Sequence, residues 1–222
     1  MAEGLEIIYH DDHLVVAFKP AGLLCVPGRG ADKQDCLSAQ VQARFSDALV
    51  VHRLDMATSG LVLMARGLVN QRVLSSAFAN RQVHKTYTAR VAGDALAVAP
   101  GAATAWQTID LPLCADWPNR PRQKVDLMMG KPSLTRWRLQ PAADSGDCED
   151  SKGLLELEPV TGRTHQLRVH LASIGMPILG DQLYAPPDIA QATNRLMLHA
   201  RSLSFKHPET LEEIYFIDNI IL

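Results

Sequence analysis

The chain has 222 residues and a mass of 24.3 kDa, which is enough for one sizeable hydrophobic core or two small ones. Hydrophobic residues make up 47% of it, as in ordinary globular proteins. No apolar stretch approaches the roughly 20 residues that span a bilayer, and the first six residues are acidic where a secretory signal would be basic. The sequence therefore predicts a cytoplasmic protein without a membrane segment.

The charge and the cysteine content argue against further classes of protein. The 22 Lys and Arg residues stand against 24 Asp and Glu residues, giving a formal charge of −2, which argues against a non-specific nucleic-acid binder. The four cysteines contain no CxxC pair, so neither a zinc site nor a disulfide framework is predicted. One stretch is locally basic, and it fits either a binding patch or a solvated face: Arg120, Arg122, Lys124, Lys131, Arg136 and Arg138.

The N-terminal part of the chain predicts a hairpin and then a helix. Apolar runs at residues 5–9 and 14–18 flank a polar turn, which is typical of two antiparallel strands. A helix is expected next, with Asp32 or Asp35 as its N-cap. Its apolar stripe would cover one face of a sheet, and consists of Leu37, Val41 and Phe45.

The next segment predicts a strand, a short polar connection and a second strand. The connection is residues 52–60, between apolar runs at 49–51 and 61–65. Residues 68–80 then favour a helix that buries Val69, Val73 and Ala77, with Phe78 beside them. Residues 83–91 alternate as a strand on which Tyr87 points inward, as packing tyrosines also do.

In the second half, residues 95–105 predict a loop because they are small and contain Pro and Gly. Strands are expected at 133–139 and 154–157, and the acidic run 142–152 between them is the best candidate for an exposed insertion. A third helix is expected to be capped by Thr164 and to end at Gly175 and Pro177. Arg168 lies one residue off the apolar stripe of this helix, where an ordinary surface cation would lie.

Asp55 is the most informative residue, because it lies in the polar connection between two strands that are expected to be buried in the hydrophobic core. A carboxylate beside buried strands is costly unless it is paired or hydrogen-bonded. Thr58, Ser59 and the turn at Gly60 could supply local donors. Taken alone, the spacing fits a turn aspartate capped by its own loop as well as a functional carboxylate.

Several motifs together resemble one known family. Residues 52–65, HRLDMATSGLVLMA, resemble the active-site stretch of the RluA family of pseudouridine synthases. A second similar stretch is 161–170, TGRTHQLRVH, and a third is Lys85-Thr86-Tyr87. Shorter similar stretches occur in the family's order along nearly the whole chain, at 18–23, 177–181 and 198–200.

The resemblance implies isomerisation of a uridine within RNA, with no cofactor and no metal. It assigns Asp55 as the nucleophile and Arg168 as the cation that pairs with it and keeps it ionised. It places Tyr87 near the target uracil, where its hydroxyl would assist proton transfer at carbon 5. The implied partner is an RNA stem-loop, bound by a monomeric protein.

The target nucleotide must leave the RNA stack to reach a buried carboxylate. The resemblance assigns Arg53 as the residue that fills the gap, although an exposed cation fits this position equally. Further candidates for RNA binding, each of which could instead be an ordinary surface or satisfied polar residue, are His52, Arg120, Lys124, Arg163 and His165.

By resemblance, the expected fold is α+β, with a mixed, largely antiparallel central sheet, flanking helices and an active-site cleft. We expect residues 1–222 to form a single catalytic domain without a separate N-terminal RNA-binding module. Residues 116–124, DWPNRPRQK, narrow the resemblance to a branch that modifies a tRNA anticodon stem-loop and a stem-loop of large-subunit rRNA.

Two alternatives remain open. The first is a non-catalytic RNA-binding protein of the same fold. The second is a glycosidase-like hydrolase, which normally needs a second carboxylate about 5–9.5 Å from the first. No second acid stands out beside Asp55 in the sequence.

Overall fold

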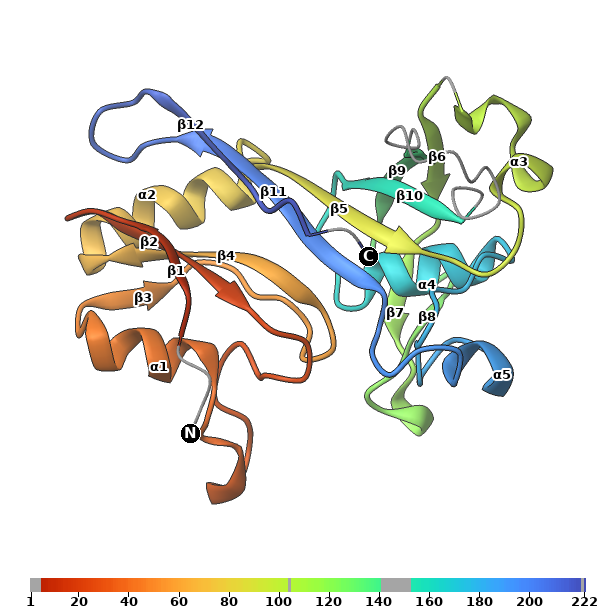
Figure 1. Ribbon diagram of the computed structural model, residues 1–222, viewed down its shortest axis with the longest axis horizontal. Coiled ribbons are helices and arrows are strands. Elements are labelled where there is room, and N and C mark those ends of the chain that lie inside the picture. Colours follow the sequence, from red (N-terminus) through yellow and green to blue (C-terminus); the bar gives the residue numbers. More distant parts are fainter. Residues whose placement is uncertain (1–4, 104, 141–152, 221) are drawn as a thin grey trace. The chain divides into compact units, whose positions relative to one another are not determined.

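A computed structural model describes residues 5–103, 105–140, 153–220 and 222 (Figure 1). The chain forms two compact units. The first comprises Met1–Lys85 and Ala200–Ile220, and the second comprises Thr86–His199 and Ile221–Leu222. Each unit combines antiparallel strands with short helices, so the predicted α+β class is confirmed.

The first unit is built on antiparallel strands. The predicted hairpin is confirmed as β1 and β2, and β2 pairs with β4 so that Lys19 lies opposite Gly60. β3 also pairs with β4, while β11, most of which belongs to this unit, pairs with β12. The strands are β1 Ile7–His10, β2 Leu14–Lys19, β3 Ala48–Val50, β4 Ser59–Arg66, β11 Leu198–Lys206 and β12 Glu213–Ile217.

The helices of the first unit are α1 Leu37–Arg44 and α2 Gly67–Ala79, with a 3₁₀ turn at Ala31–Lys33. Neither predicted aspartate caps α1. Its N-cap is Cys36, which provides no side-chain cap, and the Asp35 carboxylate instead accepts a hydrogen bond from Gln40.

The predicted buried face of α2 is wrong at Val69 and Val73 and confirmed at Ala77 and Phe78. Val69 and Val73 are exposed, whereas Leu74 is fully buried. Ala77 and Phe78 pack against the same core as Leu74. The helix therefore turns its i, i+3, i+4 positions to the sheet instead of the i, i+4, i+8 series.

The hydrophobic core of the first unit lies between α2 and the strands. Its members come from β2, β4, α2 and β11 and from Val83, just before β5, and are fully or almost fully buried. Burying such aliphatic and aromatic side chains stabilises a fold by roughly 1.5–3 kcal/mol each. The cluster consists of Leu14, Val16, Leu61, Leu63, Ala65, Leu74, Val83, Leu203 and Phe205.

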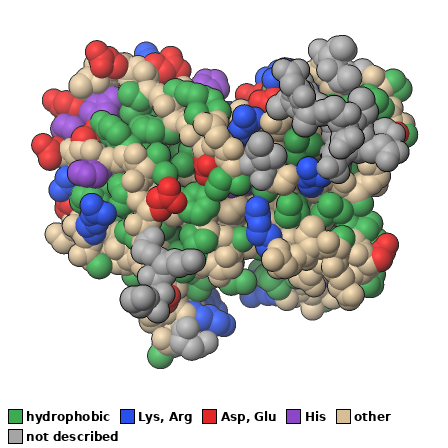
Figure 2. All heavy atoms as spheres, in the orientation of Figure 1, with side chains coloured by type: hydrophobic (Ala, Val, Ile, Leu, Met, Phe, Trp, Pro, Cys, Tyr) green, Lys and Arg blue, Asp and Glu red, His purple; other side chains and the backbone are tan. Residues whose placement is uncertain are grey.

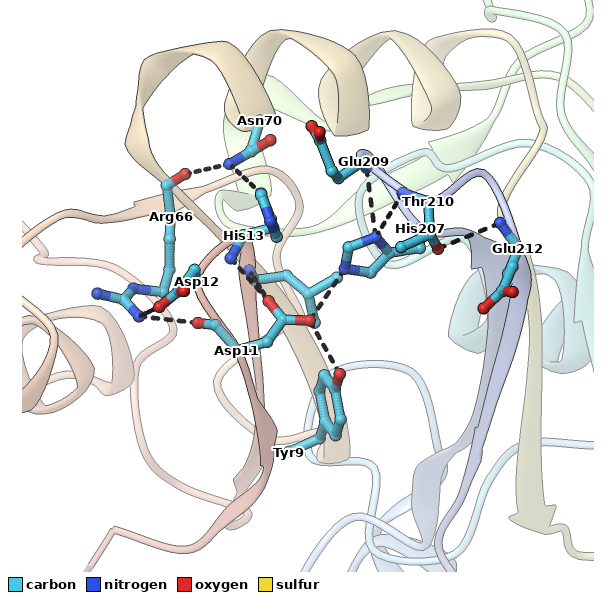
Figure 3. A network of polar contacts seen from close by, with 11 residues as sticks. Tyr9, Asp11, Asp12, His13, Arg66, Asn70, His207, Glu209, Thr210 and Glu212 are labelled. Atoms are coloured by element: carbon cyan, nitrogen blue, oxygen red, sulfur yellow. Dashed lines mark hydrogen bonds and ion pairs between the residues drawn. The ribbon is translucent and has the colours of Figure 1, made fainter.

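A polar network joins the turn between β1 and β2 to the turn after β11 (Figure 3). The Asp11 carboxylate accepts hydrogen bonds from the amides of His13 and Leu14 and from the Tyr9 hydroxyl. His207 Nε2 lies 2.9 Å from the same carboxylate. Figure 2 shows histidine side chains grouped with acidic ones on the visible face of this unit. The network therefore links segments 196 residues apart.

The second unit contains a four-stranded antiparallel sheet in the order β5-β10-β9-β6 and a separate two-stranded pair, β7 and β8. Predicted strands at 133–139 and 154–157 correspond to β9 and β10. The strands are β5 His84–Arg90, β6 Gln107–Asp110, β7 Leu113–Ala115, β8 Gln123–Val125, β9 Leu134–Leu139 and β10 Leu154–Pro159.

The helices of this unit are α3 Ala95–Val98, α4 Gln166–Ser173 and α5 Pro187–Ala190, with 3₁₀ turns at Pro100–Ala103 and Trp117–Asn119. The predicted loop at 95–105 therefore contains a helix, which Asp94 caps by accepting the amide of Leu96. The predicted acidic insertion at 142–152 lies outside the described residues. Within the described ranges, no helix is long and apolar enough to cross a membrane.

Candidate active site

Asp55 lies in the connection between β3 and β4, as the sequence predicts. Its side chain is half-buried, and its carbonyl oxygen accepts a hydrogen bond from the amide of Thr58 at 3.1 Å. The loop leads into β4, whose second residue, Gly60, has a φ of +117°. A Cβ atom there would lie 2.3 Å from the Ala200 carbonyl oxygen, so only glycine fits.

Lys19 is a buried cation beside this loop that sequence reasoning missed. It is 0% exposed, and its Nζ donates hydrogen bonds to the carbonyl oxygens of Pro20, Leu23 and Met56 at 2.8–2.9 Å. The Met56 carbonyl also accepts the amide of Gly22 at 2.8 Å. Lys19 therefore ties the residue that follows Asp55 to the end of β2.

The pKa of Lys19 reflects both its burial and its charged neighbours. Burial lowers the pKa of Lys19 to about 8, and the nearby Cys25 and Asp55 oppose part of that shift. Three carbonyl dipoles stabilise an ammonium without cancelling its charge. The only sequence signal was that Lys19 belongs to the family-like stretch 18–23.

His52 packs inside the first unit. Its ring stacks on Phe78 with centroids 4.4 Å apart, and its Nε2 accepts the amide of Leu63 at 2.9 Å. Burial and the positive charge of Lys85 lower the pKa of His52 to about 3, so the ring is neutral at physiological pH. These contacts give His52 a structural role, and its predicted RNA contact stays a prediction, as does that of the exposed Arg53.

In the second unit, Arg168 is buried instead of lying at a solvent edge, so the surface-cation interpretation is wrong. Its Nε and Nη2 form a bidentate pair with the Asp181 carboxylate at 2.8 and 2.6 Å. Asp181 Oδ1 also accepts the amides of Leu183 and Tyr184. The carboxylate makes burial of the guanidinium possible. The sequence did not indicate this partner, and pairing of Arg168 with Asp55 stays a prediction.

His165 connects the start of α4 to other parts of the unit. It is the N-cap of α4 with a φ of 54°, so the predicted Thr164 cap is wrong. His165 Nδ1 lies 2.6 Å from the Tyr184 hydroxyl, which accepts the amide of Gln123 on β8 at 2.8 Å. The Arg168 guanidinium lies 5.1 Å from the Tyr184 ring centroid. Tyr184 therefore links β8 to the Arg168 environment.

Tyr87 lies on β5 opposite Leu157 of β10 and is half-buried, between a half-buried Thr86 and a buried Thr88. Pairing of β5 with β10 fixes the backbone of Tyr87. Its role near a uracil stays a prediction.

The predicted basic stretch divides into two parts. Arg136 and Arg138 on β9 form ion pairs with Glu158 and Glu156 on β10 at 2.7 and 2.6 Å. By contrast, the Arg120 guanidinium is exposed and stacks on Trp117 at 3.4 Å. Two other predicted RNA contacts, Lys124 and Arg163, are exposed as well. In the described part of the chain, no group of three His, Cys, Asp or Glu side chains is placed to hold a metal ion.

Comparison with known proteins defines the class. A family model described as RNA pseudouridylate synthase matches residues 13–173. The chain therefore belongs to the RNA pseudouridylate synthase family, which confirms the resemblance read from residues 52–65 and 161–170. The predicted enzyme class, an isomerase that acts on RNA, is confirmed with it and displaces the hydrolase and non-catalytic alternatives.

Comparison with individual proteins shows which members of this family have similar sequences and structures. The chain is 45% identical to "Dual-specificity RNA pseudouridine synthase RluA" of Vibrio cholerae over 93% of its own length and 79% of the relative's. It is 44% identical to the protein of that name from Escherichia coli K12 over 92% and 88% of the two lengths. The solved structure of "Human RNA Pseudouridylate Synthase Domain Containing 1" matches with a TM-score of 0.75 and 26% identity, covering 98% of this chain and 84% of the human one.

Proposed function

We propose that this protein converts a specific uridine to pseudouridine in a tRNA anticodon stem-loop, in a stem-loop of large-subunit rRNA, or in both. The relatives from V. cholerae and E. coli carry names that state dual specificity for RNA. The observation that best supports catalysis is the anchored Asp55 loop, because Lys19 bonds its Met56 carbonyl together with the carbonyls of Pro20 and Leu23 after β2.

In this proposal, the Asp55 carboxylate begins the reaction by attack on the anomeric carbon or on carbon 6 of the uracil, or by assisting an elimination. The glycosidic bond to N1 breaks, the uracil turns in the site, carbon 5 bonds to the sugar, and any covalent bond to the Asp55 carboxylate is broken, which restores the enzyme. The proton on carbon 5 leaves and N1 gains one, so the product is an isomer of the substrate. No electrons are transferred, which is why neither a cofactor nor a metal is proposed.

Tyr87 and Arg168 are proposed to serve the same reaction, Tyr87 in proton transfer at carbon 5 and Arg168 in keeping the nucleophile ionised. The bidentate pair with Asp181 supports a fixed orientation for the Arg168 guanidinium. Asp181 is thus proposed as a positioning residue for Arg168.

RNA recognition is proposed to use Arg53 as the side chain that replaces the flipped nucleotide. Further contacts are proposed for His52, Arg120, Lys124, Arg163 and His165. We also propose that the protein acts as a monomer in the cytoplasm, with residues 1–222 as one catalytic domain.

The experiment uses purified protein and synthetic RNA stem-loops of roughly 20 nucleotides, a size that presents one loop with splayed bases. Mass-spectrometric mapping after selective chemical derivatisation of pseudouridine, which has the same mass as uridine, should find one pseudouridine in the anticodon stem-loop, the rRNA stem-loop or both, and none in a scrambled loop of equal composition. Modification of neither stem-loop would contradict the proposed substrates.

A further inference from the structure

The turn that follows β8 places three consecutive large apolar side chains in solvent. Leu127, Met128 and Met129 are 76%, 89% and 79% exposed, more than any other large hydrophobic residue in the described part of the chain. Single exposed apolar residues are common on soluble proteins, but adjacent ones on a protruding turn indicate a contact surface. We call residues 127–129 the apolar turn.

The apolar turn has a fixed backbone. Asp126 Oδ1 accepts the amides of Met128 and Met129 at 3.1 and 3.0 Å, and the Asp126 carbonyl accepts the amide of Gly130 at 2.9 Å. A Cβ atom on Gly130 would lie 2.3 Å from that carbonyl oxygen, so the closing position requires glycine. The three side chains are therefore presented outward by a preformed turn, which lowers the entropic cost of a contact.

The surroundings of the apolar turn are cationic. Residues 120–132 contain the cations Arg120, Arg122, Lys124 and Lys131 against one acid, Asp126. All four cations are exposed. The acid is engaged by the amides of its own turn and by Lys124 Nζ at 3.4 Å.

A fifth cation reaches this region from the segment before α4. Arg163 is exposed, and its Nε donates a hydrogen bond to the Pro132 carbonyl at 3.3 Å. The apolar turn thus has Lys124 before it, and Lys131 and Arg163 after it. A partner with apolar faces and a negatively charged backbone complements this arrangement, and unpaired nucleotides have both.

We propose that the apolar turn is a wedge that packs against unstacked bases of the RNA stem-loop, while Lys124, Lys131 and Arg163 contact the flanking phosphates. This inference rests on the proposed function, because it names a surface that grips the substrate of that reaction. Leu and Met side chains insert between bases in other nucleic-acid complexes, and flexible methionines adapt to irregular base faces. Single-stranded loops expose such faces, whereas paired helices do not.

The test measures RNA binding by the full chain in the Asp55→Asn background, which separates binding from turnover. The variant Leu127→Ser/Met128→Ser/Met129→Ser is compared with a control, Leu68→Ser/Val69→Ser, which removes exposed apolar side chains from α2. The Kd is measured for the unmodified form of the stem-loop that the wild-type protein converts. It should rise at least about 10-fold in the turn variant and stay within twofold in the control. The slope of log K against log salt should be unchanged in the turn variant but smaller by about 1 in Lys131→Gln.

Three outcomes would overturn the wedge. The first is an unchanged Kd in the turn variant, which would indicate that the apolar turn contacts a protein partner instead of RNA. The second is an equal loss of affinity for a fully paired duplex of the same length, and the third is an equal loss in the control. If the triple variant does not fold by circular dichroism, Met128→Ser replaces it, with an expected rise of about threefold. Pseudouridine formation by the wild-type protein is measured separately, so failure of the wedge leaves the proposed function intact.

Discussion

Among the described residues, each unit buries one Lys or Arg side chain, and the two side chains are stabilised in different ways. Lys19 in the first unit is held by three backbone carbonyls, whereas Arg168 in the second is held by the Asp181 carboxylate. Burial lowers the pKa of Lys19 to about 8, and the negative charges of Cys25 and Asp55 oppose part of that shift. A carboxylate accepts two hydrogen bonds from the guanidinium and so fixes its direction.

The difference indicates two separate tasks. Lys19 donates hydrogen bonds to backbone carbonyls, so it sets the position of the main chain at its three partners. These are Pro20, Leu23 and Met56. Arg168 is paired with the Asp181 carboxylate, and this pair sets the orientation of the Arg168 side chain itself. Removing a partner should therefore affect stability and catalysis differently in the two units.

The largest effect is expected when the charge of Asp181 is removed. In Asp181→Asn the Arg168 guanidinium stays buried without its counter-charge, which costs about 3–5 kcal/mol in comparable pairs. Urea unfolding should show this loss, and kcat should fall further than any change in KM. In the matched control Glu158→Gln, which breaks the half-exposed pair with Arg136, unfolding should change by less than about 1 kcal/mol. Equal small changes in both variants would remove the positioning role of Asp181.

A smaller loss is expected for Lys19→Met. The apolar side chain fits the buried site, but three carbonyls lose a donor, so the free energy of unfolding should fall by about 1–3 kcal/mol. Because the loop bearing Asp55 loses its tie, kcat should fall while the Kd for RNA changes less than twofold. A variant with normal kcat would show that the loop is positioned without Lys19.

The pKa of His52 predicts the next effect. The neutral ring is favoured in the folded state, where its pKa is about 3, whereas the unfolded chain takes up the proton near pH 6.5. The free energy of unfolding should therefore fall as the pH drops below 6.5, by at most about 1.4 kcal/mol per pH unit. His52→Gln, which can still accept the Leu63 amide, should show a shallower dependence between pH 7 and 5. The same slope in both proteins would contradict this assignment.

The sequence predicted some of this site well and some of it poorly, for physical reasons. The strand–loop–strand context of Asp55 was predictable because apolar runs and a polar connection are local patterns. The burial of Lys19 was not, because lysine is rarely buried and its partners are carbonyls that every residue carries. The Arg168–Asp181 pair was missed because the two residues lie 13 positions apart, beyond the spacing of neighbours on one helix.

The same limits apply to the helices. The position of α2 was close to the prediction, but its buried face depends on how the sheet meets the helix, so Leu74 is buried in place of Val69 and Val73. The predicted Thr164 cap failed because His165 adopts the left-handed conformation at the start of α4. Periodicity therefore located α2 and α4 but missed α3, while tertiary contacts decided which side chains the helices bury.

The most direct measurement concerns Asp55 itself. Conversion of uridine to pseudouridine removes the hydrogen from carbon 5, so RNA labelled with tritium at that position releases it on turnover. Purified Asp55→Asn should release none above background under single-turnover conditions, while its Kd for the stem-loop stays within twofold of wild type, because the substitution is isosteric and removes only the charge. Asp47→Asn, which alters a carboxylate 3.1 Å from Arg66 on the same unit, should release tritium at the wild-type rate. Tritium release by Asp55→Asn at a measurable rate would contradict its role as the nucleophile.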